Sequence, residues 1–181
     1  VKMKGKKVKI TRPIDAMRHG IAYLPEDRKV DGIVGDLSVR ENIILAQQVL
    51  RGFFKPFSKA EANKIAEEYI KLLDIKTASA DTPIKSLSGG NQQKVLLAKW
   101  MFADPDVLIL DEPTAVLTPQ EIDELMATMK EFAREGKSIL FISHKLNEIM
   151  EVSDRVTVLR KGKCIGTVET KDTTKEELSR M

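Results

Sequence analysis

The sequence predicts an α/β fold, a mostly parallel sheet with a helical insert, and three observations indicate it. Short runs of β-forming residues alternate with helical patterns along most of the chain, as expected for an α/β domain. Residues 107–110 are all apolar, which is typical of a strand buried in a parallel sheet. Between residues 37 and 104 the alternation gives way to helical patterns alone. We therefore expect residues 1–181 to form one domain, with residues 37–104 as a helical subdomain within it.

The segment before the insert is predicted to hold two strands and one short helix. The strands cover residues 6–10 and 21–24, and the helix covers residues 15–19. Gly20 follows this helix, where glycine commonly ends helices. A polar loop is expected over residues 25–36.

Two capping boxes mark helix starts inside the insert. Ser38 precedes Glu41 by three residues, and Ser58 precedes Glu61 in the same way; a serine and a glutamate at this spacing satisfy the free N–H groups of a helix start. The second helix should reach about residue 74, because its apolar residues recur at helical spacing. They are Ile65, Tyr69, Leu72 and Leu73.

The alternation of strands and helices resumes after the insert. A third capping box at Thr118 has Pro119 in the favoured first helical position. The helix that it opens carries one apolar face, made of Ile122, Leu125, Met126, Met129 and Phe132. The remaining predictions are a strand over 138–142, a helix over 145–151, a hairpin of 155–159 with 163–168 around Lys161-Gly162, and a last helix from Thr174.

Composition excludes several classes of protein. Charged residues make up 31% of the chain and the net charge is only +3, too little to indicate nucleic-acid binding. The five lysines of the opening VKMKGKKVK are interpreted as the solvated end of a strand. Cys164 is the one cysteine, so no internal disulfide or cysteine metal cluster can form. Apolar runs fall far short of the roughly 20 residues that span a bilayer.

The stretch LSGGNQQKVLLAKW places two glycines at the head of an apolar helix, although glycine is costly inside a helix. Ser88 can cap this helix, whose first N–H groups have no internal partner and carry partial positive charge. Gly89 and Gly90 would leave these groups accessible, and the result would be a site for a phosphate. The alternative is a serine-capped helix whose glycines only make a turn.

Two adjacent carboxylates, Asp111 and Glu112, follow the apolar run 107–110. Ligands of α/β folds bind at the carboxyl ends of the strands. One carboxylate could hold Mg²⁺ and the other could orient and deprotonate a water molecule. The alternative, two solvated acids in a loop, is weakened by the apolar residues directly before them.

His144 follows another apolar strand, in ILFISH. A single histidine after a strand is most often structural or simply exposed. If the strands are parallel, however, they bring His144 close to Asp111 and Glu112. It could then contact a terminal phosphate or the attacking water.

Together these motifs resemble those of the ABC-type ATPases, over nearly the whole chain. LSGGNQQ resembles the signature motif, VLILDEPT the Walker B motif with its catalytic glutamate, and TAVLT the D-loop. His144 matches the switch histidine. The continuation NQQK, with PEDRKVDG at residues 25–32, is similar to the sugar and nucleoside importer branch, whose chains often carry two tandem ATPase domains. AVLTPQEI is closer to nucleoside importers.

The resemblance implies an ATPase that couples ATP hydrolysis to substrate import at the cytoplasmic face of the membrane. Asp111 would hold Mg²⁺, Glu112 would act as general base, and His144 would sense the γ-phosphate. Partners would be a second ATPase domain, membrane permease subunits and, indirectly, a periplasmic or lipoprotein substrate-binding protein. Residues that contact ATP, its Mg²⁺ and water, or the partner domain's ATP would be Glu26, Leu87, Ser88, Gly89, Gly90, Asn91 and Gln92.

Several features depart from the family pattern. The family's P-loop, G-x-x-x-x-G-K-[ST], is not found; Gly136-Lys137-Ser138 reads GKS, but residue 131 is Glu131 rather than glycine. We interpret Gly136 as the end of a helix and expect the P-loop before Val1, so that residues 1–181 are a partial ATPase domain. Glu26 stands where the family has glutamine, and Thr118 follows Leu117 where it has aspartate.

The two halves also resemble different domains of the tandem importers. Residues 25–32 and 87–100 resemble the second domain, whereas AVLTPQEI and ISHKLNEI resemble the first. This predicts a chain joined near Asp111–Thr114, a string that both domains share. Two alternative functions stay open: a non-hydrolysing module that only offers its signature face to an intact partner, and a soluble ABC ATPase.

Overall fold

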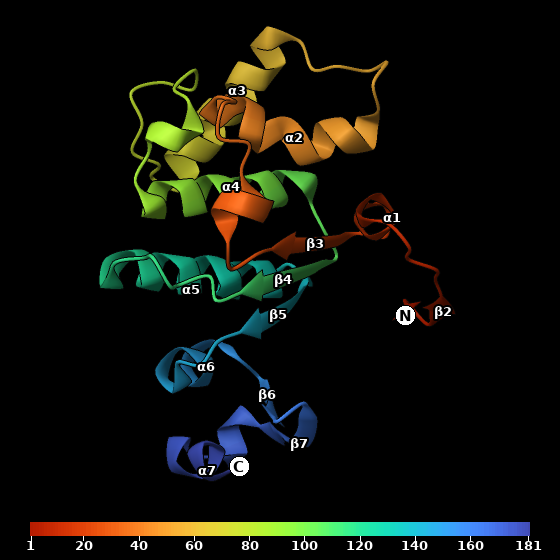
Figure 1. Cartoon of the computed structure of the whole chain (residues 1–181), viewed down its shortest axis with the longest axis vertical. Helices are drawn as coiled ribbons and strands as arrows, with labels where there is room; N and C mark the ends of the chain where they lie inside the picture. Colours follow the sequence, from red (N-terminus) through yellow and green to blue (C-terminus); the bar gives the residue numbers. More distant parts are fainter.

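A three-stranded parallel sheet forms the centre of the computed structural model, which describes residues 1–181. Its order is β3 (Ile21–Leu24), β4 (Val107–Asp111) and β5 (Ser138–Ile142). Ala22 lies opposite Leu108, which in turn lies opposite Ile139. All three strands therefore end at the same edge of the sheet, and the α/β prediction with a parallel core is confirmed (Figure 1).

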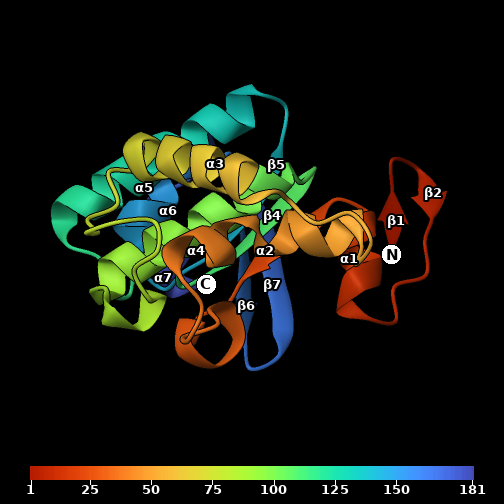
Figure 2. The same ribbon diagram turned by 90° about the horizontal axis from the view of Figure 1, so that it is seen from above.

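The helical insert lies over one side of this sheet (Figure 1). It contains α2 (Val39–Arg51), α3 (Lys59–Leu72), the short 3₁₀ turn η2 (Ile84–Ser86) and α4 (Gly89–Ala103). The capping boxes at Ser38, Ser58 and Thr118 are all present, as predicted. Nine of the 15 residues of α4 are buried, because this helix lies between the rest of the insert and the sheet (Figures 1 and 2).

The other elements flank the sheet. They are α1 (Pro13–Arg18), the π-helix η1 (Arg28–Gly32), α5 (Pro119–Arg134), α6 (Leu146–Val152), β6 (Arg155–Arg160), β7 (Lys163–Glu169), the 3₁₀ turn η3 (Thr170–Asp172) and α7 (Lys175–Arg180). The predicted hairpin of β6 and β7 is confirmed, with Lys161 and Gly162 both at positive φ. Gly136 follows α5 with φ +86°, as expected of a residue that ends a helix.

One hydrophobic core joins the insert to the sheet. It holds 17 buried residues, drawn from both parts of the chain. Val39, Ile43 and Leu96 of the insert are completely buried, as is Leu110 of β4. The insert is thus packed onto the sheet as part of the same core, which fixes the start of α4 relative to the strands.

The predicted strand over residues 6–10 is wrong. The structure has two short strands there, β1 (Lys2–Met3) and β2 (Lys6–Lys7), which pair antiparallel. Lys4 and Gly5 have φ of +47° and +77°, and such a pair makes a tight hairpin turn. The prediction missed β1 and extended β2 too far, because Lys9 alternates with the apolar Val8 and Ile10 as in a strand. Two smaller differences are that α1 begins at Pro13, not residue 15, and that η1 lies within the predicted loop 25–36.

Two strand edges in the middle of the molecule have no partner. β5 pairs only with β4, and β6 pairs only with β7. Apolar side chains are exposed on both strands, with Leu140 and Ile142 of β5 at 56% and 50% and Leu159 of β6 at 72%. Figure 1 places β6 beyond this free edge of β5.

None of the helices has both the length and the apolar character needed to cross a membrane.

Candidate active site

The carboxyl end of β4 presents two acids in different ways. Asp111 is the last residue of the strand, and its Oδ2 accepts a hydrogen bond of 3.0 Å from the Tyr23 hydroxyl. This bond, followed by burial, raises the pKa of Tyr23. Glu112 has left the strand conformation, with φ +43°, and its N–H donates to the Ile142 carbonyl of β5 at 3.0 Å. Such a φ is uncommon for residues other than glycine, and here the neighbouring strand holds it.

Glu112 and His144 lie together, as predicted from the parallel strands. His144 Nδ1 is 2.9 Å from Glu112 Oε1. The glutamate side chain is only 16% exposed, whereas that of the histidine is 78% exposed. The second carboxylate oxygen, Glu112 Oε2, is buried and has no hydrogen-bond partner. A buried acceptor without a partner is costly, so a rotation of the Glu112 side chain that brings this oxygen to water would be favourable.

A second, buried network ties the two segments that carry Glu112 and His144. Glu148 of α6 is 8% exposed and its Oε2 accepts a bond of 2.8 Å from the Thr114 hydroxyl. Lys145 Nζ lies 3.2 Å from Glu148 Oε1 and donates to the Thr114 hydroxyl at 3.0 Å. The Ser143 hydroxyl also approaches Glu148, at 3.5 Å. The chain after β4 and the chain after β5 are therefore joined on both sides of the Glu112–His144 pair.

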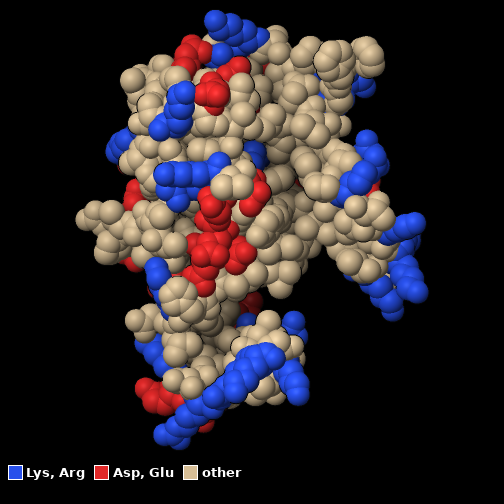
Figure 3. Space-filling view, in the orientation of Figure 1, with Lys and Arg blue, Asp and Glu red and all other residues tan.

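The residues present fit a magnesium ion that takes most of its ligands from phosphates and water and few from the protein. No cluster of three or more acidic, histidine or cysteine side chains could bind a metal alone. Tyr23 engages Oδ2 of Asp111, which leaves Oδ1 to a metal or to its water. Mg²⁺ bound beside substrate phosphates commonly takes only one or two carboxylates from the protein. Figure 3 shows acidic side chains gathered where β3 and β4 end, with basic ones beside them.

The start of α4 is capped as predicted. Ser88 Oγ accepts from the Asn91 N–H and side-chain amide, at 3.4 and 2.9 Å. Gln92 donates to the carbonyls of Ile84 and Leu87, at 3.3 and 3.1 Å. Asn91 and Gln92 are 9% and 5% exposed. The buried side chains of Asn91 and Gln92 therefore hold the loop before α4 through hydrogen bonds, whereas Ser88 itself is exposed.

The two glycines of α4 are approached by side chains of the same chain. A Cβ on Gly89 would lie 2.7 Å from Arg28 Nη2, and one on Gly90 would lie 2.5 Å from Glu121 Oε1. Arg28 Nε also donates to Gln92 at 3.2 Å. Gly89 thus brings a guanidinium group of η1 to the head of α4. Gly90 is buried, and a carboxylate covers it.

Sequence reasoning missed Tyr23, Arg28, Glu121 and Glu148. Their contacts depend on how distant segments meet: Tyr23 and Asp111 are 88 residues apart, and Thr114 and Glu148 are 34 apart. Arg28 belongs to PEDRKVDG, residues 25–32. This segment was used for the family resemblance, but no contact was predicted for its arginine. Glu26 is exposed, and nothing in the structure brings its side chain to Asp111 or Glu112.

The architecture is that of an ATP-binding cassette. The cassette MJ0796, solved as a dimer bound to ADP and phosphate, matches with a TM-score of 0.73 over 89% of this chain and 68% of its own. The sequence identity is 20%, so this likeness concerns the fold alone. The chain belongs to the ABC transporter family, whose sequence profile matches residues 1–115.

Relatives with known roles are much closer in sequence. The fructose import ATP-binding protein FruK of Bifidobacterium longum is 43% identical over 94% of this chain and 33% of its own length. The galactofuranose transporter ATP-binding protein YtfR of Escherichia coli is 43% identical over 92% of this chain and 33% of its own. The xylose import ATP-binding protein XylG of Thermoanaerobacter pseudethanolicus is 41% identical over 97% and 35%. The chain therefore spans about a third of the length of these relatives.

Proposed function

We propose that this chain is part of the ATP-binding subunit of a sugar importer and contributes to the ATP hydrolysis that drives uptake. The observation that carries the proposal is the Glu112–His144 pair, 2.9 Å apart beside Asp111 at the carboxyl end of the sheet. The unpartnered oxygen of Glu112 would orient a water molecule and take its proton once the side chain turns it toward the substrate. The named relatives all handle sugars, which favours sugars over nucleosides.

The residues divide the proposed reaction among them. Glu112 orients and deprotonates the attacking water, and His144 holds Glu112 from its exposed side and faces the terminal phosphate. Asp111, oriented by Tyr23, would hold Mg²⁺, which when bound neutralises the charge of the phosphates. Glu26 stays a proposed contact of the metal and its water.

The start of α4 is proposed to complete the ATP site of a second cassette domain. Ser88 and Gly89 offer the exposed end of the helix dipole, which attracts phosphate, and Arg28 adds a positive charge beside them. Leu87, Gly90, Asn91 and Gln92 would act by keeping this loop in shape. Glu121, already bonded to Thr118, limits the anion to the side of Gly89.

The P-loop is proposed to lie before Val1, on a strand that would pair with the free edge of β5. That edge is open and carries exposed apolar side chains, and the relatives are about three times as long as this chain. Residues 37–104 would then be the signature subdomain of a larger cassette. Reading the DNA upstream of the Val1 codon in frame tests this proposal; a start codon nearby without G-x-x-x-x-G-K-[ST] would contradict it.

The test of the catalytic assignment is Glu112→Gln in the full-length gene product. We expect hydrolysis to fall by about a hundredfold or more, with ATP binding retained because the amide keeps the shape of the side chain. Glu151→Gln, an exposed acid paired with Lys130, is the matched control and should hydrolyse ATP normally. Wild-type hydrolysis by Glu112→Gln would refute the role of general base.

A non-hydrolysing role is the second candidate, because the only catalytic groups assigned here need a P-loop to hold their substrate. In that case the chain would stimulate an intact cassette through its signature face alone. Mixing it with such a cassette and then repeating the assay with Gly89→Asp separates the two. Stimulation that disappears in Gly89→Asp supports the module.

The remaining partners follow the same reasoning. A sugar importer needs membrane permease subunits and a substrate-binding protein, and its ATP-binding subunit works at the cytoplasmic face.

The proposed junction near Asp111–Thr114 has its own test, which is long-read sequencing through the locus. An uninterrupted tandem gene without such a junction would refute a natural hybrid.

A further inference from the structure

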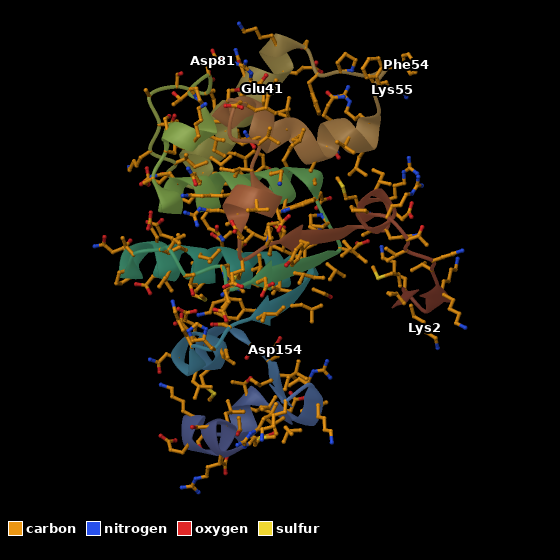
Figure 4. All side chains as sticks on the ribbon, in the orientation of Figure 1. Lys2, Glu41, Phe54, Lys55, Asp81 and Asp154 are labelled. Carbon is orange, nitrogen blue, oxygen red and sulfur yellow. The ribbon has the colours of Figure 1, made fainter.

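The loop between α2 and α3 displays two phenylalanines to solvent. Phe53 and Phe54 are 90% and 93% exposed, the highest values among the large apolar residues. Their rings meet edge to face with centroids 5.5 Å apart. Figure 4 shows Phe54 and Lys55 at the outer tip of the helical insert, away from the body of the molecule. None of the interactions described for the cassette uses them.

The loop is built to hold this shape. Gln48 of α2 donates to the carbonyls of Gly52 and Lys55, at 3.2 and 3.4 Å, and accepts from the Phe57 N–H at 2.9 Å. Gly52 turns the chain out of the helix with φ +88°. One glutamine side chain therefore fixes both ends of the segment that carries Phe53 and Phe54.

The third phenylalanine of the loop is turned inward. The ring of Phe57 packs on Phe102 of α4, with centroids 5.7 Å apart, and Arg51 lies over it at 4.0 Å. Phe57 therefore covers the apolar surface of α4 at Phe102. Phe53 and Phe54 stay outside although burial of a phenylalanine ring is favourable, which indicates an apolar partner beyond the chain.

Basic residues outnumber acids around the rings, where Glu61 at the end of the loop interacts with Arg51. Residues 51–60 include Arg51, Lys55 and Lys59 and no acid. The β1–β2 hairpin, with exposed lysines, lies toward the same side of the molecule in both ribbon views (Figures 1 and 2), and Figure 3 shows basic side chains along that edge. This side therefore offers protruding aromatic rings within a positive field, the combination that suits the interface of an anionic bilayer.

We propose that the Phe53–Phe54 loop inserts into the headgroup region of anionic lipid, with Arg51, Lys55 and Lys59 contacting the phosphates. The insertion goes beyond the proposed transport function and does not depend on ATP. It gives the chain a lipid contact of its own, in addition to any contact with permease subunits. Each contribution is small, so binding should be reversible and should weaken as salt screens the charges.

The test is co-sedimentation of the chain, kept dilute, with vesicles of phosphatidylcholine, with and without phosphatidylglycerol. A sample without vesicles measures how much of the chain sediments alone, and this amount is subtracted. We expect binding to the anionic vesicles, and a loss of about tenfold or more in Phe53→Ser/Phe54→Ser, because two rings no longer enter the lipid. Leu159→Ser, which removes another exposed apolar side chain, is the matched control and should bind normally. Circular dichroism of each variant checks that the fold is intact.

A second measurement reports the loop itself. Trp100 is the only tryptophan, so Phe54→Trp adds one probe at the tip, and its emission should shift to the blue with anionic vesicles while the wild type stays unchanged. The proposal is overturned if the wild type fails to sediment with anionic vesicles, or if Phe54→Trp shows no shift. It is also overturned if Lys6→Glu/Lys7→Glu abolishes binding that Phe53→Ser/Phe54→Ser leaves intact.

Discussion

Glu148 is a charged residue that is only 8% exposed, and three neighbours satisfy it. Glu148→Gln should lower the free energy of unfolding by about 1–3 kcal/mol, because the ammonium group of Lys145 would lose its partner in a partly buried place. Urea denaturation measures this loss. In the full-length protein the same variant should also lower kcat while KM changes less. The reason is that it loosens the segments that hold Glu112 against His144.

The control for this experiment is Glu151→Gln on the same helix. Glu151 pairs with Lys130 at the surface, with side chains about half exposed, so its loss should change stability by less than about 0.5 kcal/mol. Equal losses of unfolding free energy in the two variants would mean that the buried network around Glu148 adds no stability beyond that of a surface ion pair.

Lys99 gives a prediction about pH. Its residue is 7% exposed, its Nζ donates to the Gly32 carbonyl at 2.8 Å, and burial lowers its pKa from 10.5 to about 8. Between pH 8 and 10 the unfolded chain therefore keeps a proton on Lys99 that the folded chain has released. Stability relative to Lys99→Met should rise over this range, by more than about 1 kcal/mol. Thermal or urea unfolding at several pH values tests it, and parallel curves would contradict it.

The acids and the histidine of the site were predictable one by one from sequence. Asp111 and His144 follow apolar runs that end at the same sheet edge, so their neighbourhood follows from parallel pairing alone. Tyr23 was not predictable as a partner of Asp111, because it lies inside the predicted strand 21–24 and nothing in that pattern marks its hydroxyl as facing the site. Neither was the unpartnered oxygen of Glu112, which depends on side-chain burial.

At the scale of elements, helix starts were the most predictable features. The starts of α2, α3 and α5 each rest on a serine or threonine and a glutamate three residues later, a local pattern that tertiary contacts did not override. The first ten residues show the opposite case. There a two-residue turn with φ above zero decided the structure, and the sequence K-G is a weaker sign of it than N-G or D-G.

The two capping boxes of the insert should differ in strength. Ser38 is 7% exposed, whereas Ser58 is exposed. The hydrogen bonds of Ser38 hold the pKa of Glu41 below its usual range, and those of Ser58 do the same for the pKa of Glu61, so burial is the difference between the two boxes. Ser38→Ala should cost about 1–2 kcal/mol in urea unfolding, and Ser58→Ala about 0.5–1 kcal/mol, since water can replace the exposed bonds. A larger loss for Ser58→Ala would argue against burial as the cause.

For the whole molecule, the alternation of strands and helices predicted the parallel sheet, and the interruption between residues 37 and 104 predicted the insert. What the sequence did not reveal is how closely the parts depend on each other. Glu121 of α5 covers Gly90 of α4, and Lys94 of α4 pairs with Glu124 of α5 at 2.8 Å. The head of α4 therefore cannot move freely relative to the segment that follows Glu112.

The free edge of β5 also has a consequence for handling the chain. An exposed strand edge with apolar side chains is a template on which another chain can add a strand, and Leu140 and Ile142 supply those side chains here. Copies that meet edge to edge would extend the three-stranded sheet from one molecule into the next. Whatever covers β5 in the cell therefore also protects the chain from aggregation, and a preparation that leaves this edge bare should precipitate as its concentration rises.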